Sequence, residues 1–336
     1  MSTIKDVARL AGVSPSTVSR VLSGEGPSAA SPKTKEKIWE AVRATGYSVN
    51  EAAHNLRKRE TDSKVTDDHA IDCILARELD FFIDPFLSSL RHEIEESMFK
   101  KGYRIRSQFG LSDLTSHLNP DFKKRAAAII LGRVDAVNLK ALKENYRDLI
   151  YVGLQDLELG IDSVICSGYE AVAKAMDYLV SLGHKKICYL GETKDEQRYN
   201  AYIDKGREYG IDCSHSLIID VFFTPSDSYE SLKEALENGL DCTAILCAND
   251  VSAIGVLKAL KEYHIAVPEE ISVIGINDVE NIRYLKPMLT TVSIPAKEMG
   301  DHVVKLLIDR IEQNHTVPVK LYVPSQLTKR DSCSEV

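Results

Sequence analysis

The sequence lacks the patterns that would define a membrane protein, a metalloprotein or a common enzyme. No stretch of its 336 residues approaches the roughly 20 apolar residues that a membrane-spanning helix needs, and its first ten residues hold no apolar leader. Its seven cysteines form no CxxC pair and no zinc-like spacing, so we expect core thiols and no metal. No GxSxG, GxGxxG or P-loop follows a predicted strand, so we expect neither catalysis nor a cofactor. These absences predict a cytoplasmic protein in a reducing compartment.

The charge is unevenly distributed along the chain. Residues 1–60 carry a net charge of +4 and the remainder −12, which together give the overall −8. A basic segment on an acidic body suits contact with a polyanion at one end only. The length predicts two or three domains.

The first 46 residues show three helical patterns. Apolar positions at helical spacing are each preceded by a start signal: Thr3 with Asp6, Ser14 with Pro15, and Ser31 with Pro32. Gly12 separates the first two helices, so residues 1–47 are predicted to form an all-α helix-turn-helix domain.

The second predicted helix has a short-chained outer face that can lie in a major groove. Arg20 can reach the acceptors of guanine from there. The exposed residues are Pro15, Ser16, Thr17, Ser19 and Arg20. The helix pattern alone also fits a three-helix protein-binding module in which Arg20 is merely solvated.

The run TIKDVARLAGVSPSTVSRVLSG at residues 3–24 resembles the DNA-binding signature of the lactose/galactose repressor family. The resemblance implies that Pro15 and Ser16 select the operator sequence, whereas Thr17, Ser19 and Arg20 make general contacts. Thr3 and Ser14, at the two helix starts, complete the predicted DNA-binding surface.

Residues 48–60 resemble the hinge helix of that family, which enters the minor groove. Leu56 is the expected wedge that kinks the duplex. The resemblance implies that the hinge residues at DNA are Asn50, His54, Leu56 and Arg57. Val49 and His54 stand where the family usually has proline and arginine. A solvated linker with an incidental leucine is the alternative.

From residue 70 to residue 330, apolar strands alternate with helices, which predicts two Rossmann-like α/β lobes that face a cleft. Residues 61–69 are the expected linker and residues 331–336 a polar tail. The predicted strands lie at 71–76, 103–107, 126–132, 149–153, 185–191, 216–222, 242–249, 271–278 and 319–325.

Polar and aromatic residues follow several of these strands, where parallel sheets bind ligands. Planar amides suit paired sugar hydroxyls, and an aromatic plate suits the apolar face of a sugar ring. The candidates are Arg198, Phe223, Asn249, Asn277 and Asp278. Helix caps, a surface ion pair and a core aromatic are the structural alternatives.

The runs at 179–187, 248–255 and 273–292 resemble the periplasmic-binding-protein-like domain of the same repressor family. This resemblance implies that Arg198, Asn249 and Asn277 contact an effector. It also implies that Phe81, Asp84 and Phe86 close over the ligand. Gln155 stands where aspartate is common, and the residues after Arg198 depart from the usual Arg-x-x-Gly-Phe.

These features predict a homodimeric repressor that a small sugar, galactose- or galactoside-like, releases from a palindromic DNA operator. The alternative within the family is a ligand-activated regulator of the purine or phosphocarrier-dependent type. A sugar-transport protein would share the body but not the basic head, and an α/β enzyme would need a motif that the chain lacks.

Overall fold

A computed structural model divides the chain into two compact units, residues 1–66 and 67–336, which are considered separately. The residues that it describes are 4–15, 17–18, 34, 37–38, 41, 69–76, 84–114 and 125–336. In this part of the chain, no helix is long and apolar enough to cross a membrane.

The first unit contains α1 (Ile4–Ala11) and a small apolar core. Gly12 ends α1 with a positive φ of 67°, which glycine adopts without a steric penalty. The hydroxyl of Ser14 then accepts a hydrogen bond from the backbone of Thr17, as an N-cap does. The buried residues are Val7, Ala8, Ala11, Val18, Ile38 and Ala41, so the apolar faces predicted for the three helices meet in one core.

Six strands of the described chain form the sheet of the first lobe of the second unit, in the order β11-β5-β4-β3-β1-β2. All their pairings are parallel. The strands are β1 (Ala70–Leu75), β2 (Arg104–Gly110), β3 (Arg125–Leu131), β4 (Tyr146–Gly153), β5 (Asp162–Ile165) and β11 (Lys320–Tyr322).

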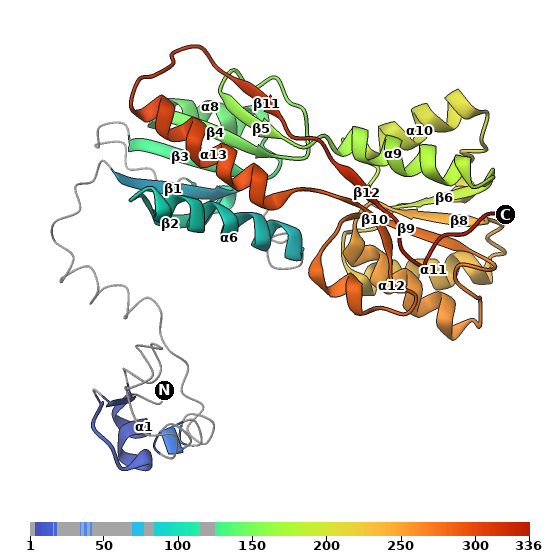
Figure 1. Ribbon diagram of the computed structural model, residues 1–336, viewed down its shortest axis with the longest axis horizontal. Coiled ribbons are helices and arrows are strands. Elements are labelled where there is room, and N and C mark those ends of the chain that lie inside the picture. The colour runs from blue at the N-terminus through green and yellow to red at the C-terminus, as the bar shows by residue number, and fades with distance from the viewer. Residues whose placement is uncertain are drawn as a thin grey trace. The chain divides into compact units, whose positions relative to one another are not determined.

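Helices cover both faces of this sheet. Helices α6 (Pro85–Lys100) and α13 (Ala296–Ile311) pack against each other on the face that carries Ile71 and Ile129 (Figure 1). Helix α8 (Ala136–Asn145) packs with Ile130 on the opposite face. A short 3-10 helix, η2 (Leu111–Asp113), follows β2.

The second lobe repeats this plan with the strand order β12-β10-β9-β8-β6-β7, within residues 187–328, all of which are described. Only the edge strand β12 is antiparallel to its neighbour. The strands are β6 (Ile187–Leu190), β7 (Ile218–Ile219), β8 (Ala244–Cys247), β9 (Ser272–Asn277), β10 (Thr290–Ser293) and β12 (Gln326–Thr328).

Two pairs of helices cover this second sheet, one pair on each face (Figure 1). One pair is α9 (Gly168–Ser181) with α10 (Gln197–Tyr209), and the other is α11 (Pro225–Glu237) with α12 (Asp250–Glu262). The 3-10 helices η3 (His215–Leu217) and η4 (Glu280–Tyr284) lie in the connections.

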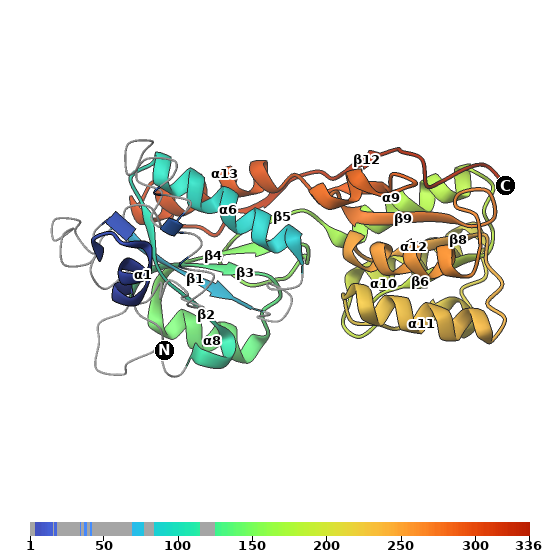
Figure 2. The ribbon, with the colours of Figure 1, turned by 90° about the horizontal axis from the view of Figure 1, so that it is seen from below.

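The chain passes between the lobes three times, from β5 to α9, from β10 to α13 and from β11 to β12 (Figure 2). Each lobe is therefore built from separate stretches of sequence. The last residues, 331–336, pack on the second lobe, where Ser332 is fully buried and its carbonyl accepts a hydrogen bond from the backbone of Val273.

The alternating pattern located the main strands, but several of them are shorter than predicted, such as β11, which was expected over 319–325. The strand expected over 216–222 is only Ile218–Ile219, because the chain turns into a loop in which Phe222 is exposed and Phe223 is buried. Sequence reasoning also missed the short strands β5, β10 and β12 and the helix α8, whose patterns are too brief or too polar to stand out.

Candidate functional site

The carboxyl ends of the central strands in the two lobes face each other across a cleft within the second unit. In the first lobe, Arg133 follows β3 and Gln155 follows β4. In the second lobe, Asn249 follows β8, and Asn277 ends β9. Parallel α/β sheets bind ligands at such strand ends.

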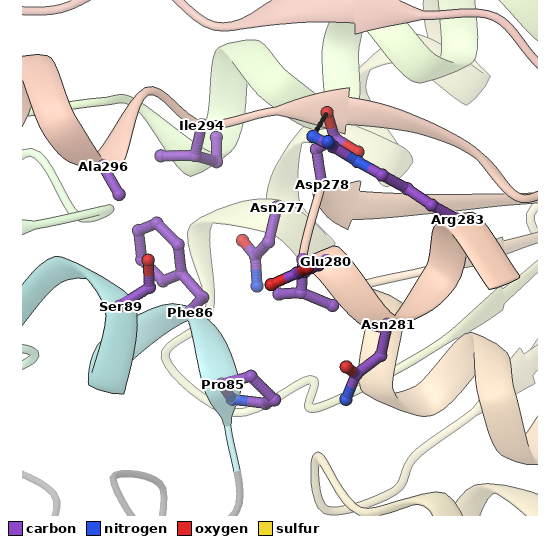
Figure 3. Close-up of a pocket in the computed structure, with 11 residues that line it drawn as sticks. Pro85, Phe86, Ser89, Asn277, Asp278, Glu280, Asn281, Arg283, Ile294 and Ala296 are labelled. Carbon is purple, nitrogen blue, oxygen red and sulfur yellow. Dashed lines mark ion pairs between the residues drawn. The ribbon is translucent and has the colours of Figure 1, made fainter. Parts of the chain in front are cut away.

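A cavity of about 410 Å³ lies in this cleft, within the range of small-molecule sites (Figure 3). Its first wall is the start of α6, and its second wall is the loop after β9 together with the start of α13. The predicted residues Phe86, Asn277 and Asp278 line it, beside Pro85, Ser89, Val279, Glu280, Asn281, Arg283, Ile294 and Ala296.

Asn277 is the exceptional residue of this cavity. It is 3% exposed, and neither the oxygen nor the nitrogen of its side-chain amide has a hydrogen-bond partner. Its backbone has a φ of 119°, a conformation that costs a non-glycine residue free energy. Buried polar groups are nearly always paired, so this amide is available to a ligand.

Asp250 holds the loop that carries Asn277. Its carboxylate accepts hydrogen bonds from the backbone of Val279 at 2.9 Å and from the hydroxyl of Thr291 at 2.7 Å. Gly275 leaves room for it, since a Cβ there would lie 2.2 Å from the Asp250 Oδ1 atom. Complete burial raises the pKa of Asp250 to about 8, although both hydrogen bonds lower it.

Asp278 lines the cavity, but protein groups already bind its carboxylate. Arg330 donates a hydrogen bond to Oδ1, and the guanidinium of Arg283 lies 3.6 Å from Oδ2. Asp278 therefore mainly holds the loop after β9 in place, and its own backbone has a φ of 59°.

Asn249 caps a helix with one half of its side-chain amide and leaves the other half unpaired. Its side-chain oxygen caps α12 by accepting a hydrogen bond from the backbone of Ser252 at 2.9 Å. Its amide nitrogen is buried and has no partner. The cap therefore uses only half of the amide.

Arg198 does not line the cavity, and protein groups accept hydrogen bonds from three of its five guanidinium N–H groups. Its Nε and Nη2 donate to the two carboxylate oxygens of Glu196 at 3.0 and 2.9 Å, and its Nη1 donates to the carbonyl of Ala248 at 2.7 Å. Its guanidinium carbon lies 4.4 Å from the ring centre of Phe223, a cation–π distance. Phe223 thus supports Arg198 and is not among the residues that line the cavity.

Glu196 was not predicted, although it connects the lobes. It caps α10 through the backbone of Arg198, and it accepts a hydrogen bond from Arg133 of the first lobe at 2.8 Å. Burial by itself would raise the pKa of Glu196, but the adjacent guanidinium groups, Arg198 foremost, lower it to about 2. A glutamate two residues before an arginine is too common a pattern to reveal this pairing.

A second contact between the lobes lies beside this ion pair. The Gln155 side chain donates to the carbonyl of Asp195 at 3.3 Å. The side chain of Gln197 exchanges two hydrogen bonds of 3.0 Å with the backbone of Asp156. The α10 side of the cleft is therefore fastened by polar contacts.

The first-lobe loop predicted to cover the ligand is described only from Asp84 onward. Asp84 caps α6 by accepting a hydrogen bond from the backbone of Phe86 at 2.9 Å. Phe86 is 3% exposed and lines the cavity. Phe81 lies outside the described residues.

Of the predicted DNA-binding residues, three are described. Ser14 and Pro15 are exposed, and the hydroxyls of Ser14 and Thr17 form a hydrogen bond of 2.8 Å. The others lie outside the described residues: Thr3, Ser16, Ser19, Arg20, Asn50, His54, Leu56 and Arg57.

Within the described residues, no group of three or more His, Cys, Asp or Glu side chains could hold a metal ion. The seven cysteines, all described, are free thiols, and five of them are buried.

Two family models match parts of the chain, one in each unit. Residues 3–50 match the family model of bacterial regulatory proteins of the lacI family, and residues 176–333 match that of the periplasmic binding protein-like domain. The HTH-type transcriptional repressor PurR of Mannheimia succiniciproducens is 28% identical, and the alignment covers 100% of each chain.

Solved structures of the same architecture are also similar. The transcriptional regulator CelR in complex with cellobiose matches with a TM-score of 0.70 at 23% identity, over 99% of this chain and 100% of that one. The lac repressor dimer bound to operator and the anti-inducer ONPF matches with a TM-score of 0.69 at 23% identity, over 99% of both chains.

Proposed function

Because this chain belongs to the lacI family of bacterial regulatory proteins and is a transcriptional repressor of that family, we propose that a small sugar in the cleft controls its binding to operator DNA. The helix-turn-helix unit binds the DNA, and homologous repressors are not enzymes. The identity of the ligand and the direction of control form the proposal.

The unpartnered amide of Asn277 carries the proposal of a sugar. One amide offers an acceptor and two donors, which match the hydroxyls of a pyranose ring. Asn249 adds a free donor from the neighbouring strand β8, and Phe86 offers an apolar surface on the opposite wall. A galactose- or galactoside-like ring, small enough for a cavity of about 410 Å³, fits this chemistry.

At the DNA, we propose that two copies bind a palindromic operator as a homodimer. One helix-turn-helix buries little DNA, and a two-fold dimer matches two half-sites. Pro15 and Ser16 would read the major groove, Arg20 would reach guanine and Leu56 would wedge the central step. The similar lac repressor structure is a dimer on operator.

Fluorescence anisotropy with a labelled palindromic duplex tests the proposal. We expect tight binding at low salt that weakens when galactose or a galactoside is added, because DNA and inducer favour different states of the protein. Arg20→Ala, which leaves the cleft intact, should lose operator binding and keep sugar binding. A duplex affinity that no sugar changes would contradict the role of the sugar.

The second candidate is a purine-type corepressor, which the similarity to a PurR repressor favours at 28% identity over the whole chain. The same amides could pair with the edges of a purine base. The two candidates predict opposite signs, since a corepressor raises operator affinity and an inducer lowers it. Titrating a purine base and galactose in the same assay therefore separates them.

A further inference from the structure

We infer that Glu196 makes the cleft selective for uncharged ligands, because it neutralises the guanidinium of Arg198 and so removes an anion-binding group from the α10 side of the cleft, next to the cavity lining. The inference rests on the proposed function in that it concerns the ligand of the same cleft. It assigns a specificity-determining role to a residue that touches both lobes.

Protein acceptors already take three of the five N–H groups of Arg198, and two of these three bonds go to a carboxylate. A free guanidinium would be the natural partner of a phosphate or carboxylate group, in a bidentate arrangement. In this protein Glu196 already occupies the Nε–Nη2 edge, and the carbonyl of Ala248 takes Nη1. Phe223 covers one face of the group.

Glu196 stays ionised at neutral pH, which makes the neutralisation permanent. Arg198 and then Arg133 outweigh the effect of burial and hold the pKa of Glu196 at about 2. An arriving anion would therefore have to displace a buried carboxylate that accepts hydrogen bonds from two guanidinium groups. The anion would replace Glu196 as the partner of Arg198, and Arg133 would lose its own partner.

Two guanidinium groups, Arg198 and Arg133, share the carboxylate of Glu196. The negative charge of Asp84, at the start of α6, acts in the same sense, since it helps to raise the pKa of Arg198. An anionic ligand at Arg198 would therefore lie close to existing carboxylates in a poorly solvated place.

The cavity wall points the same way. Among the described residues that line it, Asp278 and Glu280 are acidic. The basic one, Arg283, already lies 3.6 Å from the carboxylate of Asp278. The other polar residues that line it, Ser89, Asn277 and Asn281, are neutral.

Capping of α10 does not require this arrangement. The cap uses only the hydrogen bond from the backbone of Arg198 to Oε1 at 3.0 Å, which the side-chain oxygen of a glutamine would also accept. The bonds from Nη2 of Arg198 and from Arg133 go to Oε2, which a glutamine replaces with an NH2 group that cannot accept them. Glu196→Gln therefore separates the two roles.

The test uses inorganic phosphate as the probe and the full-length protein. Binding is measured by isothermal titration at constant ionic strength, for wild type, Glu196→Gln and the double variant Glu196→Gln/Arg198→Gln. We expect the phosphate affinity of wild type to lie below the detection limit of the titration. Glu196→Gln should bind phosphate with an affinity at least about tenfold above that limit. The double variant should lose that gain, because it lacks the released guanidinium.

Phosphate binding to wild type, or no gain in a folded Glu196→Gln protein, would overturn the inference. If Glu196→Gln does not fold, the affinities of wild type for galactose and for galactose 6-phosphate are compared by the same titration. A phosphate ester that binds as tightly as its parent sugar overturns the inference, and one that binds at least about tenfold more weakly supports it. If neither sugar binds, the sugar proposal fails, while the phosphate titration of wild type still tests the charge of the cleft.

Discussion

The two sides of the cleft differ in whether their buried polar atoms have hydrogen-bond partners within the protein. On the α10 side, all three guanidinium nitrogens of Arg198 and both oxygens of Glu196 have protein partners. On the β9 side, the amide of Asn277 has none, although a buried unpaired group costs about 1–3 kcal/mol. The difference separates a region whose polar groups are paired within the protein from the one where we propose that a ligand binds.

The carboxyl groups behind the two sides follow the same division. Glu196 is ionised because two guanidinium groups surround it, with a pKa of about 2. Asp250 has no cation among its hydrogen-bond partners, and burial raises its pKa to about 8. The buried carboxyl group on the α10 side is thus held by cations, and the one on the β9 side by neutral hydrogen-bond donors.

The strongest way to break this comparison is to remove one partner on the α10 side. Arg198→Met should lower the free energy of unfolding by about 3–5 kcal/mol, because it leaves Glu196 buried with only Arg133. The double variant Glu196→Gln/Arg198→Met should recover much of that loss. Urea denaturation measures both, and equal stability of Arg198→Met and wild type would refute the claim that folding depends on this pair.

On the β9 side, a substitution should affect binding and spare folding. Asn277→Gly removes the amide while accepting the φ of 119°, so the free energy of unfolding should stay within about 1 kcal/mol of wild type. Affinity for the effector should fall about 10- to 100-fold, as measured by isothermal titration. Operator affinity without effector should not change. Unaltered effector affinity would show that the amide does not bind the ligand.

The pH dependence of stability sharpens the comparison of the two carboxyl groups. Since the folded pKa of Asp250 lies near 8 and its ordinary value is 3.8, the folded state keeps a proton that the unfolded state releases. The free energy of unfolding should therefore fall as pH rises from about 4 to about 8, by at most about 1.4 kcal/mol per pH unit. Asp250→Asn should flatten this slope in urea titrations. A slope that survives the substitution would have to come from other groups.

The smallest effect is expected where the ion pair meets solvent. The Arg133 side chain is 25% exposed, so Arg133→Gln should lower the free energy of unfolding by no more than about 1 kcal/mol. Its effector affinity should nevertheless change, because the pair joins the two lobes. Lys186→Gln, which breaks an exposed pair inside one lobe, is the matched control and should leave effector affinity unchanged. Identical behaviour of the two variants would argue against any coupling through Arg133.

Sequence reasoning reached the elements whose signal is local. The buried runs of β3 and β9 and the long helices α9 and α13 were predicted because their apolar periodicity is strong. Strand ends then located Asn249 and Asn277, since parallel strands bring their carboxyl ends to one edge. Phe223 lies four residues after the end of β7, so the strand-end argument does not determine its role.

The parts of the site that depend on contacts distant in sequence were not predictable. Arg133 and Glu196 are 63 residues apart, and Asp278 meets Arg330 over 52 residues. Nothing in the local pattern of any of these residues indicates its partner. The same holds for Asp250 at the start of α12, whose burial depends on Gly275 in β9 and Thr291 in β10.

The three passages between the lobes have a consequence for synthesis on the ribosome. The sheet of the first lobe includes β11 at residues 320–322, and the second lobe includes β12 and the buried Ser332. Neither sheet is complete until almost the whole chain has been translated. The operator-binding segment emerges first, tens of seconds earlier at roughly 5–20 residues per second, so a stalled ribosome would display that segment without any regulating body.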